Sequence, residues 1–305
     1  MKEYCNQDHY IIDDSRRIES ILEKNNIKPD LIITSPPYYD LLNYDDNTNQ
    51  LGKGQIYDDY LETISKIFHT LYIHSNENAT FWLIIDTFKR DGETKILPFD
   101  IYYKLKSKYD YTWILKEIII WDKEKNIPWN GFGRFKNQYE FILFFSKNEN
   151  FVFNINKVRE LNDLKKWWKT YPERYNPNGK APTNIWHYTT PIRGWGNGNQ
   201  SHLCPFPFPL VEKIISISSN ENDIVFDPFA GSGSVLAISA LMRRKSYGVD
   251  INEKYKKLFS DEVLAGAILY WKERKNEIET NAKEIRDFKN LNLKLRKQKI
   301  ASNII

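Results

Sequence analysis

Short apolar segments typical of buried strands alternate with amphipathic helical segments along most of this chain. Such alternation requires a mostly parallel sheet with helices on both faces, so an α/β fold is predicted. Seven strands are expected, at 10–12, 31–33, 80–85, 113–121, 139–145, 224–226 and 247–249. Helices are expected at 15–24, 57–72, 96–108, 211–217, 233–243 and from 253 onward.

The predicted elements fall into two portions, separated by residues 147–200. Five strands precede this segment and two follow it, and neither portion is a complete domain on its own. We therefore expect the two portions to complete one sheet. The fourth and fifth strands are long, and Gly131 and Gly133 between them indicate a hairpin.

Residues 147–200 have the composition of an irregular insert. They hold four prolines, a run of glycines at 194, 196 and 198, and four of the nine tryptophans. They also carry nine Lys/Arg residues and four Asp/Glu residues. Residues 271–305, which are predicted to form a charged helix, carry ten Lys/Arg residues and five Asp/Glu residues. Concentrated positive charge indicates a polyanionic partner, with a solvated lysine-rich surface as the alternative.

The composition excludes several classes of protein. The two cysteines, Cys5 and Cys204, are far apart, and the five histidines are scattered, so neither a disulfide framework nor a metal site is expected. No apolar run approaches the length of a membrane span, and the first residues are too polar for a signal peptide. A cytoplasmic protein without membrane contact is therefore expected.

A glycine turn at 227–233, with the sequence DPFAGSG, follows a predicted strand and opens a helix. Glycines allow a ligand to approach the backbone, and the first turn of a helix offers free N–H donors. Asp250 ends the next strand, where a carboxylate can accept from both ribose hydroxyls. Leu236 stands where a dinucleotide site needs a third glycine. The turn thus favours a nucleoside-type cofactor, with an ordinary tight turn as the alternative.

A second turn, Thr34 to Tyr38, follows the buried strand at 31–33. Because ligands bind at the carboxyl ends of parallel strands, this turn is expected to border the same crevice as the glycine turn. Pro36 and Pro37 offer rigid carbonyl acceptors, Ser35 a hydroxyl, and Tyr38 a flat ring. This set suits a planar base with an exocyclic amine, although a plain proline-rich loop would look the same.

Together, TSPPY at 34–38 and FDPFAGSG at 226–233 resemble the catalytic and cofactor motifs of the S-adenosylmethionine-dependent DNA amino-methyltransferases. Their order resembles that of the permuted beta group of this family. The resemblance implies a Rossmann-like methyltransferase fold with a seven-stranded, mostly parallel sheet. It divides the chain into a circularly permuted catalytic domain (1–148 and 200–270), a target-recognition insert (149–199) and a basic C-terminal helix (271–305).

Other segments support the resemblance. Residues 11–15 are similar to an acidic turn near the cofactor's adenine, which leaves Asp13 or Asp14 as the contact. Residues 202–207 resemble a segment that borders the cofactor, and 121–123 with 139–143 resemble the family's hairpin. The implied cofactor contacts are Asp13, Asp14, His202, Pro205, Phe206, Asp227, Pro228, Phe229, Gly231, Gly233 and Asp250. The expected DNA contacts in the insert are Lys165, Lys166, Lys169, Arg174 and Arg193.

The implied reaction moves a methyl group from S-adenosylmethionine to an exocyclic amine of a flipped-out base in double-stranded DNA. The Ser35 hydroxyl and the Pro36 carbonyl would accept the two amine N–H bonds, and Tyr38 would stack on the base. In the family, serine at position 35 favours the 4-amino group of cytosine, with the 6-amino group of adenine as the alternative. A restriction-modification system, with a cognate restriction endonuclease, is the expected context.

Other chemistries are less well supported. Methylation of a cytosine ring carbon needs a cysteine after a proline, whereas Cys204 precedes its proline. A nucleic-acid-binding protein without catalysis would have no use for both turns. A nuclease could use the triplet Glu93-Thr94-Lys95 with Asp86 and Asp91, and magnesium-dependent cleavage of plasmid would support it.

Overall fold

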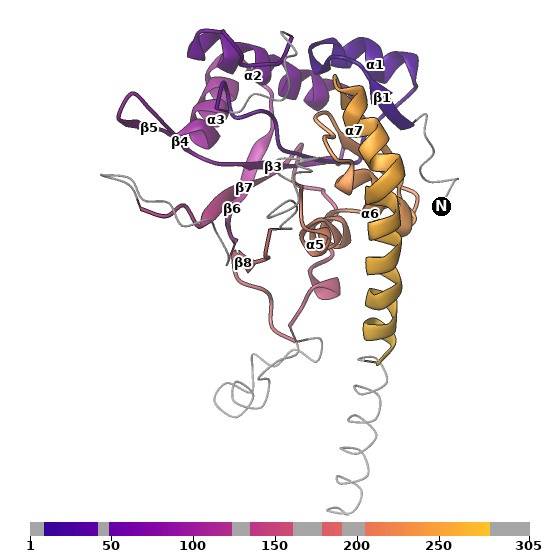
Figure 1. Cartoon of the computed structure of the whole chain (residues 1–305). Coiled ribbons are helices and arrows are strands. Elements are labelled where there is room, and N and C mark those ends of the chain that lie inside the picture. Colours follow the sequence, from indigo (N-terminus) through magenta and orange to yellow (C-terminus); the bar gives the residue numbers. More distant parts are fainter. Residues whose placement is uncertain (1–8, 42–48, 124–134, 161–178, 191–204, 281–305) are drawn as a thin grey trace, which may run out of the picture.

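The structure, a computed structural model, describes residues 9–41, 49–123, 135–160, 179–190 and 205–280. An eight-stranded sheet runs through the molecule and separates two groups of helices (Figure 1). Its strand order is β1-β10-β9-β2-β3-β7-β6-β8. In chain order the strands are β1 (Tyr10–Ile12), β2 (Leu31–Thr34), β3 (Thr80–Ile85), β6 (Ile114–Asp122), β7 (Tyr139–Ser146), β8 (Ile185–His187), β9 (Ile224–Asp227) and β10 (Lys245–Asp250).

The sheet is mostly parallel. Strands β1, β10, β9, β2 and β3 all run in the same direction, and β7 lies antiparallel to both β3 and β6. Strand β2, from the first portion of the chain, pairs with β9, from the last portion. The two portions therefore complete one sheet, and β6 with β7 forms the expected hairpin.

The sheet has eight strands where seven were expected. The additional strand, β8, comes from the segment interpreted as an irregular insert, and it pairs in parallel with β6. Only Trp186 of its three residues is buried, so the strand has no apolar run by which a sequence would show it. A further small hairpin, β4 (Phe88–Arg90) with β5 (Glu93–Lys95), lies outside the main sheet.

Two hydrophobic cores lie on opposite faces of the sheet because successive side chains of a strand point to opposite sides. In β3, Trp82 and Ile84 belong to one core, whereas Phe81 and Leu83 belong to the other. Every residue of β2 and β3 is buried, as expected of strands that are covered on both faces.

The helices divide between these faces. On one face lie α1 (Ile18–Lys24), which continues the short 3-10 helix η2 (Ser15–Arg17), α2 (Tyr57–His74) and α3 (Leu97–Lys108). On the other lie α5 (Phe208–Ser218), α6 (Ser234–Leu241) and α7 (Glu253–Leu258) (Figure 1). Helices on both faces complete the three-layered α/β architecture that the alternation predicts.

The helix predicted from residue 253 is present, and a π-helical turn at Phe259–Val263 interrupts it before it continues over 264–280. Arg274 and Tyr270 both contact the carboxylate of Glu212 and so fasten this helix to α5. Throughout the described residues, each helix is too short or too polar to span a lipid bilayer.

Candidate active site

A cavity opens at the carboxyl edge of the sheet, beside the residues that follow β1, β2, β9 and β10. Its volume is about 980 Å³, including the part that is open to solvent. Ligands of open α/β sheets bind at this place, beyond the carboxyl ends of the strands. The predicted site residues that line it are Asp14, Ser35, Pro37, Phe206, Asp227, Phe229, Gly231 and Asp250.

Asp250 ends β10 and accepts backbone hydrogen bonds on both carboxylate oxygens. Its Oδ2 accepts from the N–H of Gly231 at 2.9 Å, and its Oδ1 from the N–H of Asn252 at 2.9 Å. Burial raises the pKa of Asp250 to about 6, and these donors oppose that rise. Each carboxylate oxygen can accept a second hydrogen bond, so both can still accept from a pair of hydroxyls in the cavity.

Asp227 ends β9 and is 1% exposed. Its Oδ1 accepts from the Thr34 hydroxyl at 2.6 Å and from the backbone N–H of Phe229 at 3.0 Å. Burial, with a smaller contribution from the charge of Asp250, raises the pKa of Asp227 to about 7. A buried carboxyl of this kind becomes fully charged when a cation binds next to it.

Side chains from the first portion of the chain hold the glycine turn in place. The Tyr10 hydroxyl donates to the carbonyl of Gly231, and the Ser15 hydroxyl donates to the carbonyl of Pro228. Gly233 is the N-cap of α6 with φ of +77°, and a Cβ there would lie 2.4 Å from the ring of Phe259. Backbone conformation and packing thus both require glycine at position 233.

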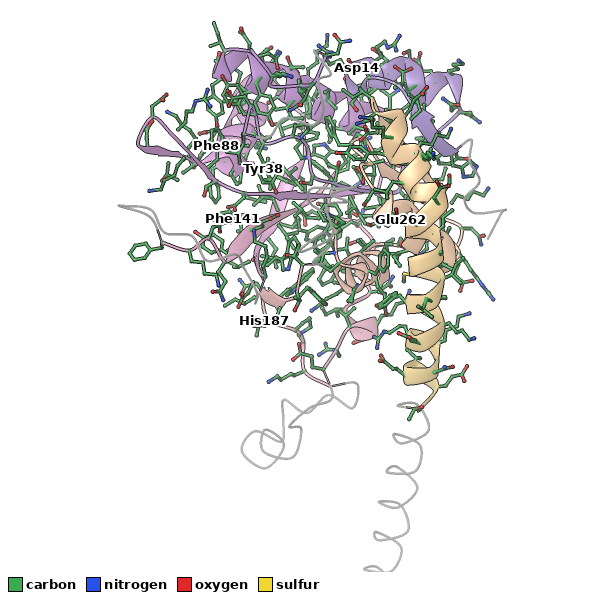
Figure 2. All side chains as sticks on the ribbon, in the orientation of Figure 1. Asp14, Tyr38, Phe88, Phe141, His187 and Glu262 are labelled. Carbon is green, nitrogen blue, oxygen red and sulfur yellow. The ribbon has the colours of Figure 1, made fainter. Side chains whose placement is uncertain are left out.

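Asp13 and Asp14 follow β1, and each pairs with an arginine: Asp13 with Arg17, and Asp14 with Arg16. Burial alone would raise the pKa of Asp14, but hydrogen bonds from Arg16 outweigh it and keep that pKa below its usual value. Only Asp14 of the two lines the cavity (labelled in Figure 2).

The second predicted motif lies directly after β2. Ser35 lines the cavity, and its hydroxyl lies 3.5 Å from that of Tyr38. The Tyr38 hydroxyl donates to Glu140 Oε2 at 3.0 Å. Glu140 is also paired with Lys123, whose Nζ lies 2.9 Å from Oε1. The motif is thus joined to β7 through Glu140 and to the residue that follows β6, Lys123.

The prolines of this motif stiffen the turn. Pro36 is buried, and the carbonyl of Pro37 accepts from the Tyr60 hydroxyl at 2.6 Å and from the N–H of Tyr39 at 2.9 Å. Tyr39 has φ of +57°, which is unusual for a residue other than glycine. These contacts fix the backbone around Ser35.

A further carboxyl, Asp86, lies near Glu140 and Lys123 where the chain leaves β3. It is 4% exposed and accepts hydrogen bonds from the amide of Asn137 and, at 2.7 Å, from the N–H of Thr87. Burial raises the pKa of Asp86 to about 6, and the charge of Glu140 adds to this rise, whereas Asn137 and Lys123 oppose it. The edge of the sheet next to Tyr38 is therefore strongly polar.

Some predicted residues do not line the cavity. Within the described chain these are Asp13, Pro36, Tyr38, Pro205, Pro228 and Gly233, several of which hold the residues that do. His202 and the expected DNA contacts lie outside the described residues: Lys165, Lys166, Lys169, Arg174 and Arg193. Their roles in binding cofactor and DNA therefore stay predictions from the sequence.

Sequence reasoning also missed residues that line the cavity. Ser15 is the last residue of the acidic turn and Arg16 follows it, so both could have been found from their position. Asn49 and its neighbours carry no recognisable motif, and Arg16 links them to the acidic turn by donating to the Asn49 carbonyl at 3.0 Å. The remaining missed residues are Gln50, Leu51, Ile67, Ala230, Ser232, Ser234, Ile251, Asn252 and Tyr255.

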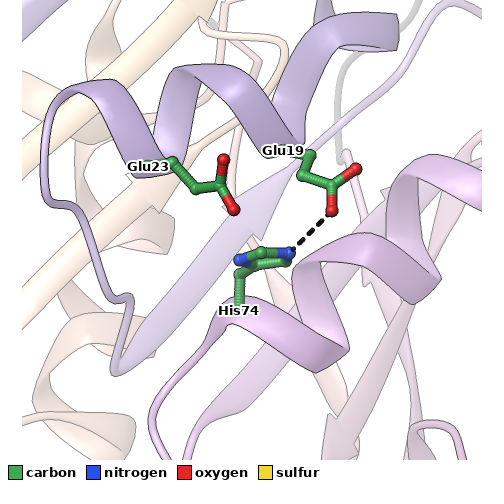
Figure 3. A group of neighbouring side chains, drawn as sticks. All are labelled: Glu19, Glu23 and His74. Atoms are coloured by element: carbon green, nitrogen blue, oxygen red, sulfur yellow. Dashed lines mark ion pairs between the residues drawn. The ribbon is translucent and has the colours of Figure 1, made fainter.

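Among the described residues, one group has the spacing of a metal site: Glu19, Glu23 and His74, with ligand atoms within 4.8 Å of one another (Figure 3). Both glutamates are exposed, and His74 already pairs with Glu19 at 3.5 Å. None of the three lines the cavity. Glu93 and Lys95, both of the triplet considered for a nuclease site, pair with each other, and neither lines the cavity.

Comparison with known sequences identifies relatives over most of the chain. The family described as DNA methylase matches residues 29–261. The Type II methyltransferase M.HpaI of Haemophilus parainfluenzae is 30% identical over 239 residues, covering 77% of this chain and 67% of the relative. The DNA adenine methyltransferase YhdJ of Escherichia coli K12 is 28% identical over 240 residues, covering 75% and 74%.

Solved structures have the same fold. The PvuII DNA methyltransferase, described as cytosine-N4-specific, superposes with a TM-score of 0.61 at 17% identity, covering 86% of this chain and 90% of that one. The complex of M1.HpyAVI with S-adenosylmethionine gives a TM-score of 0.53 at 23% identity, covering 83% and 98%. With the family match over residues 29–261, the chain belongs to the DNA methylase family, the S-adenosylmethionine-dependent amino-methyltransferases of DNA.

Proposed function

We propose that this chain methylates the 4-amino group of cytosine within a specific site of double-stranded DNA. The observation that carries the proposal is the position of Ser35: it follows β2 and lines the cavity that Asp227 and Asp250 also line. Its hydroxyl is an acceptor suited to an amine beside a cofactor site. Serine at this position supports cytosine through the family resemblance.

The cavity fits S-adenosylmethionine. Asp250 keeps acceptor capacity for the two ribose hydroxyls, and Asp227 offers a buried carboxyl for the cationic amino group of the methionine part. Phe206 and Phe229 supply apolar walls, and Asp14 is the aspartate of its pair that can face the adenine. When bound, the cofactor supplies a methyl group activated by its attachment to a sulfonium.

The protein's part in the reaction is to orient the target amine. The lone pair of an aromatic amine is delocalised into the ring, so the amine is a poor nucleophile. Accepting its N–H bonds, at the Ser35 hydroxyl and the Pro36 carbonyl, favours a pyramidal nitrogen and exposes the lone pair. The ring of Tyr38 stacks on the flipped base and holds it in place.

The 6-amino group of adenine is the second candidate, because one relative is named an adenine methyltransferase. Cytosine and adenine present the same amine geometry to Ser35, so both fit this chemistry. The insert at 149–199 would read the DNA sequence, and a cognate restriction endonuclease would be the functional partner.

Mass spectrometry of nucleosides tests this proposal directly. Plasmid DNA from a host free of DNA methylation is incubated with the purified chain and S-adenosylmethionine, and is then digested to nucleosides. We expect N4-methylcytosine. Finding N6-methyladenine instead would show that the chain methylates adenine, the second candidate. The absence of both modified nucleosides would contradict the proposal.

A further inference from the structure

Ser35, Tyr38 and Glu140 form a continuous chain of hydrogen bonds. The Ser35 hydroxyl lies 3.5 Å from the Tyr38 hydroxyl, which in turn donates to Glu140 Oε2 at 3.0 Å. Glu140 belongs to β7, next to Phe141, and Tyr38 lies after β2 (Figure 2 labels Tyr38 and Phe141). Two distant parts of the sequence therefore meet at the hydroxyl of Tyr38.

The far end of this chain is a largely buried ion pair. The side chains of Lys123 and Glu140 are only 14% and 15% exposed, and Lys123 Nζ lies 2.9 Å from Glu140 Oε1. A buried ion pair often contributes no more stability than apolar residues of similar volume would, so stability alone is a weak explanation for this pair. Its position beside Tyr38 points to a role in the site.

The charge of Glu140 fixes the direction of every hydrogen bond in the chain. A carboxylate only accepts hydrogen bonds, so Tyr38 must donate to Glu140. Tyr38 has a single proton, and its oxygen can then only accept from Ser35. The proton of Ser35 is therefore turned toward Tyr38, and its lone pairs are left for another donor.

We propose that Glu140, held by Lys123, is a positioning residue that makes Ser35 a hydrogen-bond acceptor for the target amine. This proposal rests on the role proposed for Ser35 above. An amine offers only N–H donors at this point, so a serine hydroxyl that points its own proton at the amine would repel it. Glu140 prevents that orientation from a distance, through Tyr38.

The test combines three variants with a matched control. Glu140→Gln keeps the size of the side chain but can donate as well as accept, so the direction of the chain is no longer fixed. Tyr38→Phe removes the linking hydroxyl and keeps the stacking ring, and the double variant joins the two changes. The control is Glu149→Gln, because Glu149 forms an exposed ion pair with Lys116 of β6.

Initial rates with tritiated S-adenosylmethionine and unmethylated plasmid give kcat and the KM for DNA. Loss of a hydrogen bond to a charged group corresponds to roughly a tenfold or greater effect. We expect Glu140→Gln and Tyr38→Phe each to lower kcat about tenfold with little change in KM, and Glu149→Gln to change neither. In the double variant we expect no loss beyond that of Tyr38→Phe, because Glu140 acts only through the missing hydroxyl.

Two results would overturn the role of Glu140 while leaving Ser35 intact. These are a normal kcat for Glu140→Gln alongside an inactive Ser35→Ala, or an undiminished effect of Glu140→Gln in the Tyr38→Phe background. Thermal unfolding of each variant identifies a loss that comes from misfolding. A Ser35→Ala variant with normal turnover would instead reject the proposed function and, with it, this inference.

Discussion

The hydroxyl of Thr34 donates a 2.6 Å hydrogen bond to the carboxylate of Asp227. Thr34 ends β2 and Asp227 ends β9, so the contact joins the first residue of the TSPPY motif to the acidic residue of the glycine turn. The residues are 193 positions apart in sequence. Together with the pairing of β2 and β9, this bond holds the proposed base site beside the proposed cofactor site.

Replacing Thr34 with Val keeps the shape of the buried side chain and removes that bond. We expect the free energy of unfolding to fall by about 1–2 kcal/mol and the affinity for S-adenosylmethionine to fall with it. Urea denaturation and calorimetry measure the two effects. The matched control is Thr80→Val, because the buried hydroxyl of Thr80 in β3 has no hydrogen-bond partner among the described residues. Equal losses in both variants would contradict the role of the Thr34 bond.

Asp227 should make the cofactor-free protein less stable as pH rises. Its pKa is raised by burial to about 7 from an ordinary value of 3.8, so between these values the folded state holds a proton that the unfolded chain has released. Stability contributed by the proton is therefore lost as pH climbs from about 4 to about 7, by an amount on the order of a few kcal/mol. Asp86 and Asp250 act in the same direction.

An Asp227→Asn variant isolates this effect, because the amide oxygen can still accept from Thr34 and Phe229. Urea denaturation gives the free energy of unfolding of the variant minus that of the wild type. We expect this difference to be roughly 2 kcal/mol more favourable to the variant at pH 8 than at pH 5. It should also bind S-adenosylmethionine at least tenfold more weakly, since the amide carries no charge for the cofactor's amino group. If the difference in free energy of unfolding between variant and wild type is the same at both pH values, Asp227 ionises normally.

Much of the sheet could be predicted because its strands are covered on both faces and so read as continuous apolar runs. Strands β2 and β3 are of this kind. The glycine turn was predictable for a related reason, since a short loop between a strand and a helix needs residues such as Gly233 that adopt positive φ. Both features depend on a few adjacent residues, so a short stretch of sequence is enough to indicate them.

The parts that escaped prediction depend on distant contacts. The strand β8 has one buried residue, Trp186, and is recognisable only by its pairing with β6. Tyr10 supports the glycine turn from 221 positions away, and nothing in its own neighbourhood indicates this. Lys123 and Glu140 resembled parts of a hairpin, but the hydrogen bond from Tyr38 to Glu140 is seen only when β7 lies beside β3.

Gly233→Ala should be strongly destabilising, because φ is +77° and the added Cβ would meet the ring of Phe259. Gly92→Ala is the matched control: it also has positive φ, at +81°, but has nothing within 4 Å of the added Cβ. We expect a loss of about 1 kcal/mol for Gly92→Ala and about 2–4 kcal/mol for Gly233→Ala. Thermal unfolding of both variants checks this. Similar losses would mean that the contact with Phe259 relaxes at little cost.

The segment 161–178, outside the described residues, carries three of the lysines predicted to contact DNA: Lys165, Lys166 and Lys169. If they bind phosphates, replacing all three with Ala should weaken binding to every DNA sequence alike. The slope of log affinity against log salt concentration should then fall by roughly 0.9 for each phosphate that is no longer neutralised.

Arg193→Ala provides the contrast to the triple lysine variant. An arginine that reads a guanine edge affects the preference for the methylated site, at about 1–3 kcal/mol, more than it affects the salt slope. Fluorescence anisotropy at several salt concentrations, on duplexes with and without the methylated site, distinguishes the two roles. If slope and preference are unchanged in both variants, the insert does not read the DNA, and the basic helix at 271–305 becomes the next candidate.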